Sequence, residues 1–192
     1  MTPEALDTRL AGCCGRSLVA AHYHQIESES DDCAMHDIHP EIGDFCDFGV
    51  SLALDDDTVA YVAWDETFCQ YGLMLTRTST SDFTPEGNVF NRTDHPPWKD
   101  LMADPIKSAR VIWDDFDGAP CPQAFHFSFA SSRQLLLSAA QPMTRPNGKV
   151  ELIGISDWVA VLHCQTIIES HLQTLGRLAN KSVNRSGNSR QI

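Results

Sequence analysis

The sequence predicts an α+β domain built on a curved antiparallel sheet or partly open barrel, with a short N-terminal helix and an amphipathic C-terminal helix. Two observations support the sheet. Apolar and polar residues alternate with strand periodicity in several segments, and turn-forming residues separate these segments. The third observation is an apolar stripe with helical spacing near the C-terminus. Together they indicate about nine strands framed by two helices.

The chain begins with residues that favour a helix start. Thr2 is suited to cap the helix, Pro3 fits its first turn, and the charge of Glu4 complements the helix dipole. A short helix over residues 3–10 is therefore expected, and Gly12 and Gly15 follow it.

The best-defined strands form a hairpin in the first half of the chain. Two apolar runs, residues 47–54 and 59–64, flank three aspartates that have the composition of a turn. Residues 17–26 precede this hairpin as a strand, and residues 72–78 follow it. The segments between them, residues 27–44 and 79–97, show no periodicity and are expected to be long loops.

In the second half of the chain, a short helix is predicted over residues 97–102 and a strand over residues 109–113. Further strands follow them. Phe125, Phe127 and Phe129 alternate with polar residues, and residues 134–140 return as the partner strand. The dipeptide Asn147-Gly148 predicts a type I′ turn, in which both central residues have positive φ. Strands over residues 150–155 and 158–163 are expected after it.

The C-terminal helix is predicted over residues 166–179 by an apolar stripe at spacings of four, three and four: Ile168, Leu172, Leu175 and Ala179. Residues 181–192 have little apolar content and are expected to be a disordered tail. The interpretation is a single domain over residues 1–180.

Charge is the most biased property of the sequence. Residues 17–76 contain thirteen acidic residues and no Lys or Arg. Residues 1–100 hold nineteen acids and five bases, a net charge of −14, whereas residues 101–192 hold seven acids and nine bases, a net charge of +2. Such a field repels nucleic acid and anionic membranes and attracts a basic protein surface.

A partner-binding site is predicted on the hairpin of the acidic stretch. Its residues combine carboxylates with an aromatic side chain, because buried aromatic residues dominate the energy of many interfaces. They are Asp55, Asp56, Asp57, Trp64, Asp65 and Glu66. The expected partner is a basic protein; no nucleic acid and no membrane is expected to bind.

The seven cysteines are an odd number with irregular spacing, so they do not predict a self-contained disulfide framework. Most are expected to be free thiols, and Cys13 and Cys14 are interpreted as small residues at a helix end rather than as a redox pair. Near the N-terminus, Glu4 and Asp7 stand where a secretory signal carries positive charge. A cytoplasmic location is therefore expected.

A metal site is the alternative hypothesis, because several soft or imidazole ligands fall close together. The candidate ligands are Cys33, His36 and His39 with His22 and His24 in the preceding strand. A tetrahedral zinc site needs four such ligands. The spacing matches no common zinc-finger or metalloprotease pattern, so zinc binding, by a metal-binding protein or a metal-dependent enzyme, remains an alternative to a protein without a cofactor.

No catalytic motif points to a reaction: the sequence lacks G-x-S-x-G, a P-loop and G-x-G-x-x-G. The order FGVSLALDDDTVAYVAW, YGL, PWKDLMADPI, VIWDDF and SDWVAVLH resembles small bacterial β-rich immunity proteins encoded beside secreted polymorphic toxins. The likeness covers roughly residues 16–163 and implies occlusion of a toxin without catalysis. The expected function is therefore a non-enzymatic acidic protein that neutralises a basic partner such as a toxin domain.

Overall fold

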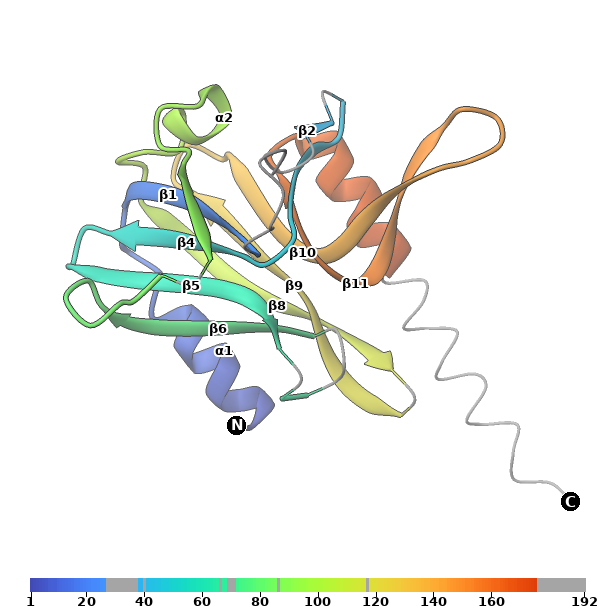
Figure 1. Cartoon of the computed structure of the whole chain (residues 1–192). Helices are drawn as coiled ribbons and strands as arrows, with labels where there is room; N and C mark the ends of the chain where they lie inside the picture. The colour runs from blue at the N-terminus through green and yellow to red at the C-terminus, as the bar shows by residue number, and fades with distance from the viewer. Residues whose placement is uncertain are drawn as a thin grey trace, which may run out of the picture.

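In the computed structural model, two antiparallel sheets face each other, and they are covered by helices (Figure 1). The structure describes residues 1–26, 38–39, 41–65, 67–68, 72–85, 87–116 and 118–175. The elements are α1 (Pro3–Ala11), β1 (Leu18–Gln25), β2 (Ile38–His39), β3 (Gly43–Cys46), β4 (Gly49–Leu54), β5 (Thr58–Asp65), β6 (Gly72–Ser79), β7 (Asn88–Asn91), α2 (Pro96–Lys99), β8 (Ile106–Phe116), β9 (Ala119–Phe129), β10 (Gln134–Thr144) and β11 (Val150–Leu162), followed by a C-terminal helix over residues 165–175.

The first sheet has the strand order β6-β5-β4-β1-β7, and the second has the order β2-β3-β11-β10-β9-β8. All ladders between these strands are antiparallel. Neither sheet closes on itself, so the predicted fold class is confirmed in its open form, with two sheets instead of one curved sheet. The strand β8 ends the second sheet, and its ladder with β9 is irregular between Ile106 and Ser108 and between Ile112 and Trp113.

The predicted hairpins are present. β4 and β5 flank the turn at residues 55–57, where Asp57 has a φ of 58°. The strands β9 and β10 form the second hairpin, in register from Gln134 opposite Ser128. Between β10 and β11, the Gly148 N–H donates to the Arg145 carbonyl at 2.9 Å. Only Gly148 of the predicted dipeptide has positive φ, so the type I′ assignment was wrong although the hairpin was correct.

The sequence missed three short strands. β2 lies in the described part of the predicted loop 27–44, β3 begins in that loop and ends at Cys46, and β7 lies in the predicted loop 79–97. The two strands expected over residues 150–155 and 158–163 are one continuous strand, β11, whose ladder with β10 shifts between Ala139 and Ala140. The expected tail at residues 181–192 lies outside the described residues and stays a prediction.

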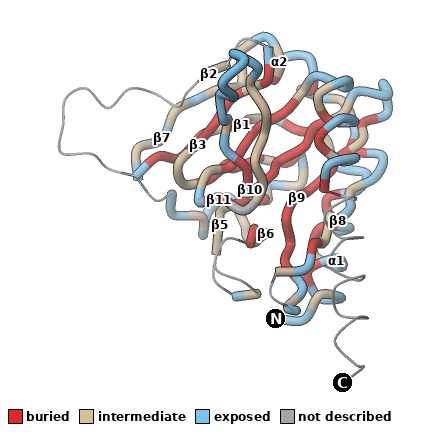
Figure 2. The backbone as a smooth tube through the Cα atoms, turned by 90° about the vertical axis from the view of Figure 1, so that its right-hand side faces the viewer, coloured by how far each residue is buried: buried red, intermediate tan, exposed pale blue. Residues whose placement is uncertain are grey.

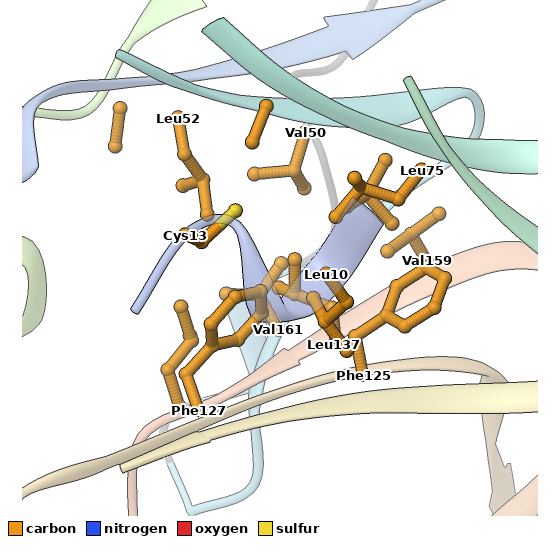
Figure 3. Close-up of a cluster of buried hydrophobic side chains, with 14 of the residues drawn as sticks. Leu10, Cys13, Val50, Leu52, Leu75, Phe125, Phe127, Leu137, Val159 and Val161 are labelled. Atoms are coloured by element: carbon orange, nitrogen blue, oxygen red, sulfur yellow. The ribbon is translucent and has the colours of Figure 1, made fainter. Parts of the chain in front are cut away.

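The main core lies between the two sheets (Figures 2 and 3). The phenylalanines of β9 that alternate with polar residues, Phe125, Phe127 and Phe129, are buried against side chains of the other sheet such as Val50 and Leu52. The helix α1 is capped by Thr2, whose Oγ1 accepts from the Ala5 N–H at 3.3 Å, and it packs against β6 and β8. Its buried leucines, Leu6 and Leu10, extend the main core between β6 and β8.

The C-terminal helix covers a second, smaller core on the outer face of the second sheet. Ile168 and Leu175 of this helix are buried with Phe45, Leu136 and Ala160 of the sheet. The part of the predicting stripe that the structure describes therefore faces the sheet, as expected of an amphipathic helix, and Ala179 lies outside the described residues. None of the helices in the described ranges is long and apolar enough to cross a membrane.

Candidate functional site

The predicted partner-binding residues begin at the β4–β5 turn. Asp55 and Asp57 are exposed there, whereas Asp56 is bound by Arg77 and by Arg16, the latter at 3.1 Å. Burial alone would raise the pKa of Asp56, but the hydrogen bond from Thr58 and the two arginine charges lower it below its usual value. One carboxylate of the turn is therefore neutralised within the chain, and two face solvent.

Trp64 and Asp65 lie at the other end of β5. A strand rises about 3.3 Å per residue, which places Asp65 about 23 Å from Thr58 at the start of the strand. Both side chains are partly exposed, and Glu66 lies outside the described residues. The predicted site therefore consists of two separate patches, the turn and the far end of β5.

A second tryptophan-acid sequence comes to the same end of the molecule as Asp65. Phe68, three residues after Asp65, packs edge-on against Trp113 of β8, with ring centroids 5.3 Å apart. Asp114 and Asp115 follow Trp113 directly. We name this group the acidic end: Trp64, Asp65, Phe68, Trp113, Asp114 and Asp115.

The acidic end combines half-buried aromatic rings with carboxylates that lack basic partners. Trp64, Phe68 and Trp113 pack against the main core but stay partly exposed, and Asp115 is exposed. Within the described ranges, no ion pair includes Asp65, Asp114 or Asp115. Sequence reasoning missed the β8 half of this surface, although Trp113-Asp114-Asp115 repeats the pattern of Trp64-Asp65-Glu66.

The histidines of the metal hypothesis do not converge in the part of the chain that the structure describes. His24 is fully buried, its Nε2 lies 2.8 Å from Ser51 Oγ, and its ring stands edge-on to Tyr61. His22 is half-buried on the same strand, where burial lowers its pKa. His39 accepts a hydrogen bond from the Glu41 N–H through Nδ1 at 3.4 Å.

The other candidate ligands, Cys33 and His36, lie outside the described residues. Inside them, no group of three or more His, Cys, Asp or Glu side chains is arranged to hold a metal ion. Zinc binding by the predicted cluster therefore stays a prediction.

Most cysteines in the described part of the chain are free thiols, either buried or at the surface. Cys13, Cys14, Cys46 and Cys164 are free, whereas Cys121 is disulfide-bonded. Burial raises the pKa of Cys13 to about 11, so its thiol stays protonated at neutral pH and is a poor nucleophile. Its side chain packs among leucines of the main core (Figure 3), which supports the interpretation of Cys13 as a small apolar residue.

Two serine-histidine pairs are present, but both are buried. Ser51 lies 2.8 Å from His24, and Ser138 Oγ lies 3.0 Å from His171 Nε2. Ser51 is 2% exposed and Ser138 is fully buried, so neither hydroxyl can reach a substrate in solution. These pairs are best understood as hydrogen bonds that satisfy polar groups inside the protein.

A buried polar network connects the two sheets near α2. The Trp98 indole N–H donates to Tyr23 Oη at 2.7 Å, and the Tyr23 hydroxyl donates to Asp44 Oδ2, also at 2.7 Å. Arg92 binds the same carboxylate at 3.4 Å, and its guanidinium lies 5.3 Å from the centre of the Tyr23 ring. Burial is the main cause that raises the pKa of Tyr23 well above its usual value. The network is therefore a structural tie between β1, β3 and α2.

The fold and the surface define an acidic, two-sheet antiparallel protein, one end of which combines partly exposed aromatic rings with carboxylates that form no ion pair within the described residues. Comparison with protein-family models, with curated proteins and with solved structures finds no significant match to this chain. Its function is therefore argued from the acidic end and the charge distribution alone.

Proposed function

We propose that this chain is a non-enzymatic binding protein whose acidic end docks a basic protein, in the manner of an immunity protein that neutralises a toxin domain. The observation that carries the proposal is the acidic end itself, where Phe68, three residues after Asp65, packs against Trp113, which begins a second tryptophan-acid sequence. Half-buried aromatic rings supply contact energy once a partner covers them. The neighbouring carboxylates mainly accelerate encounter and select a positively charged partner.

Few ion pairs within the described residues neutralise the acidic residues of 17–76, so most of their negative charge can act on a partner. Of the acids in residues 17–76, only Asp44 and Asp56 form ion pairs within the described ranges, with Arg92, Arg16 and Arg77. All three arginines come from the first hundred residues, so the bases of the second half form no ion pair with the acidic stretch in the described part. The excess negative charge of the first half therefore supports the attraction of a basic surface.

Binding to the basic product of a neighbouring gene tests the proposal. The double variant Asp65→Asn, Asp115→Asn is expected to lower the association rate constant about tenfold at low salt, because it removes two carboxylates beside the docking rings. Trp113→Ala is expected to weaken the complex by about 2 kcal/mol, mainly through faster dissociation. Surface plasmon resonance at several salt concentrations measures both effects.

The matched control is Asp55→Asn, Asp57→Asn, which makes the same change in net charge at the opposite end of β5. It is expected to leave the dissociation rate constant unchanged and to lower the association rate constant much less than the variant Asp65→Asn, Asp115→Asn does. Equal effects of the two double variants would contradict docking at the acidic end. A complex that does not depend on salt, or the lack of any complex, would contradict the proposed function.

A cytoplasmic location is part of this proposal, and Cys121 provides its test. Disulfides are rare in reducing cytosol, yet Cys121 is disulfide-bonded in this structure. If the protein works in the cytoplasm, rapid acid quenching and alkylation of host cells is expected to find Cys121 reduced. Mass spectrometry of the tryptic peptides measures this state, and a fully oxidised Cys121 would argue for an oxidising compartment instead.

A further inference from the structure

A segment that contains α2 crosses the end of β1 as a strap, which we define as residues 92–104 (Figure 1). At its start, the Arg92 N–H donates to the Ala21 carbonyl at 2.9 Å. At its end, the Ala103 N–H donates to the Leu18 carbonyl at 2.9 Å. Ala103 has a φ of 59°, which is a strained conformation for a residue with a side chain. The strap is therefore fixed to β1 at both ends.

The middle of the strap is held mainly by Trp98, which is fully buried although α2 has only four residues. Its indole N–H bonds to Tyr23, which in turn bonds to Asp44. Its ring also packs edge-on against His163, with ring centroids 4.8 Å apart and an interplanar angle of 82°. His163 directly follows β11 and precedes the C-terminal helix. One tryptophan therefore joins the strap to both sheets.

Nitrogen atoms without hydrogen-bond partners gather around this contact. Within the described residues they are both ring nitrogens of His163, Nδ1 of His95 and Nε of Arg92, all shielded from solvent. Buried polar atoms of this kind are rare in folded proteins. The charges of Asp44 and His95 both act on the pKa of His163, which shows that these groups are close.

The described charged and titratable groups around His163 include no free carboxylate that would stabilise its protonated form. Asp44 of β3 is already bound by Arg92 and by Tyr23 of β1, and His95 stands at the start of α2. Across the cavity beside His163, Asp100 is paired with Arg133 at 3.6 Å. An imidazolium at residue 163 would therefore find the nearby carboxylate of Asp44 already paired with Arg92 and no unoccupied carboxylate among these groups.

We propose that the strap is an acid-sensitive latch, in which protonation of His163 releases α2 and Trp98 while the two sheets stay folded. The four-residue helix is the smallest unit whose movement exposes the shielded ring nitrogens of His163 to water. Its release would also open the cavity of about 420 Å³ that Pro97, Asp100, Leu101 and His163 line together with the β9–β10 turn. The strain at Ala103 is relieved by the same movement.

Burial lowers the pKa of His163 to about 4, with a smaller opposing effect of Asp44 and a further lowering by His95. When the strap is open, the ring is hydrated and its pKa returns towards about 6.5. The open state therefore binds the proton first. Its population relative to the closed state is expected to rise about tenfold for each pH unit between about 6.5 and about 4.

Hydrogen exchange of the Trp98 indole N–H tests the latch. This signal is identified in ¹H–¹⁵N spectra by its loss in Trp98→Phe. After correction for the intrinsic exchange rate, its protection is expected to fall about a hundredfold between about pH 6.5 and about pH 4.5. The Leu137 amide in the main core is expected to stay much better protected than the Trp98 indole at every pH in this range, because it exchanges only when the whole domain unfolds.

His163→Gln is expected to remove the pH dependence of Trp98 protection, and His163→Phe serves if the glutamine variant does not fold. His171→Gln is the matched control, because it removes another buried histidine far from the strap and is expected to keep the wild-type pH dependence. Equal protection of the Trp98 indole and the Leu137 amide at every pH would overturn the proposal, because Trp98 would then be exposed only by global unfolding. An unchanged pH profile in a folded His163 variant would overturn it as well.

Discussion

Replacement of Asp44 by alanine is expected to lower the free energy of unfolding by about 3–5 kcal/mol. Asp44 is 5% exposed and accepts hydrogen bonds from Tyr23 and Arg92. Without its carboxylate, the Arg92 guanidinium remains in a largely buried position with no opposite charge, and the Tyr23 hydroxyl loses its acceptor. Urea denaturation at neutral pH, followed by circular dichroism, measures the loss.

Two further variants distinguish the contribution of the ion pair to stability from that of the hydrogen bonds. Tyr23→Phe is expected to cost only about 1–2 kcal/mol, because Asp44 and Arg92 still neutralise each other. The double variant Asp44→Ala, Arg92→Met is expected to be more stable than Asp44→Ala alone, because no unpaired charge is left inside the protein. A double variant that is less stable than either single variant would contradict this account of the network.

Acidification is expected to destabilise the protein through His171. Burial lowers the pKa of His171 to about 4 in the folded state, while the unfolded chain has the ordinary value of about 6.5. The unfolded state therefore binds the proton first, and stability is lost as the pH falls from about 6.5 towards about 4. The shift corresponds to about 3 kcal/mol at the lower pH.

His171→Gln isolates this contribution, because glutamine keeps a polar group near Ser138 but does not titrate in this range. Between pH 7 and pH 4, its free energy of unfolding is expected to fall about 3 kcal/mol less than that of the wild-type protein. Chemical denaturation at each pH measures the difference. Parallel stability profiles for the two proteins would show that His171 is protonated without cost in the folded state.

The sequence predicts this fold best where periodicity and turn chemistry coincide. The alternation of Phe125, Phe127 and Phe129 identifies the strand β9 and the face that packs into the main core, but not that Ala124 and His126 on the other face are buried too. The strands β2, β3 and β7 have between two and four residues, too few for any period to emerge. β3 and β7 become strands because the long strands β11 and β1, distant in the chain, supply backbone partners. β2 pairs in turn with β3.

For the same reason, the sequence predicted only part of the candidate site. The sequence identified Trp64 and Asp65, but their distance from the β4–β5 turn follows from the length of β5. The contact of Phe68 with Trp113 joins residues 45 positions apart, which no local pattern shows. The network of Tyr23, Asp44 and Trp98 joins residues up to 75 positions apart. No local pattern marks it, because its members are brought together by the ladders of β1 and β3.

The irregular ladder of β8 has a consequence for solubility. An outermost strand of eleven residues exposes unpaired backbone groups that can recruit a strand from another copy and begin aggregation. Two register shifts bend β8, and the exposed cations Lys107 and Arg110 add repulsion between like copies. These features disfavour edge-to-edge pairing of β8 between copies of a protein built mostly from strands.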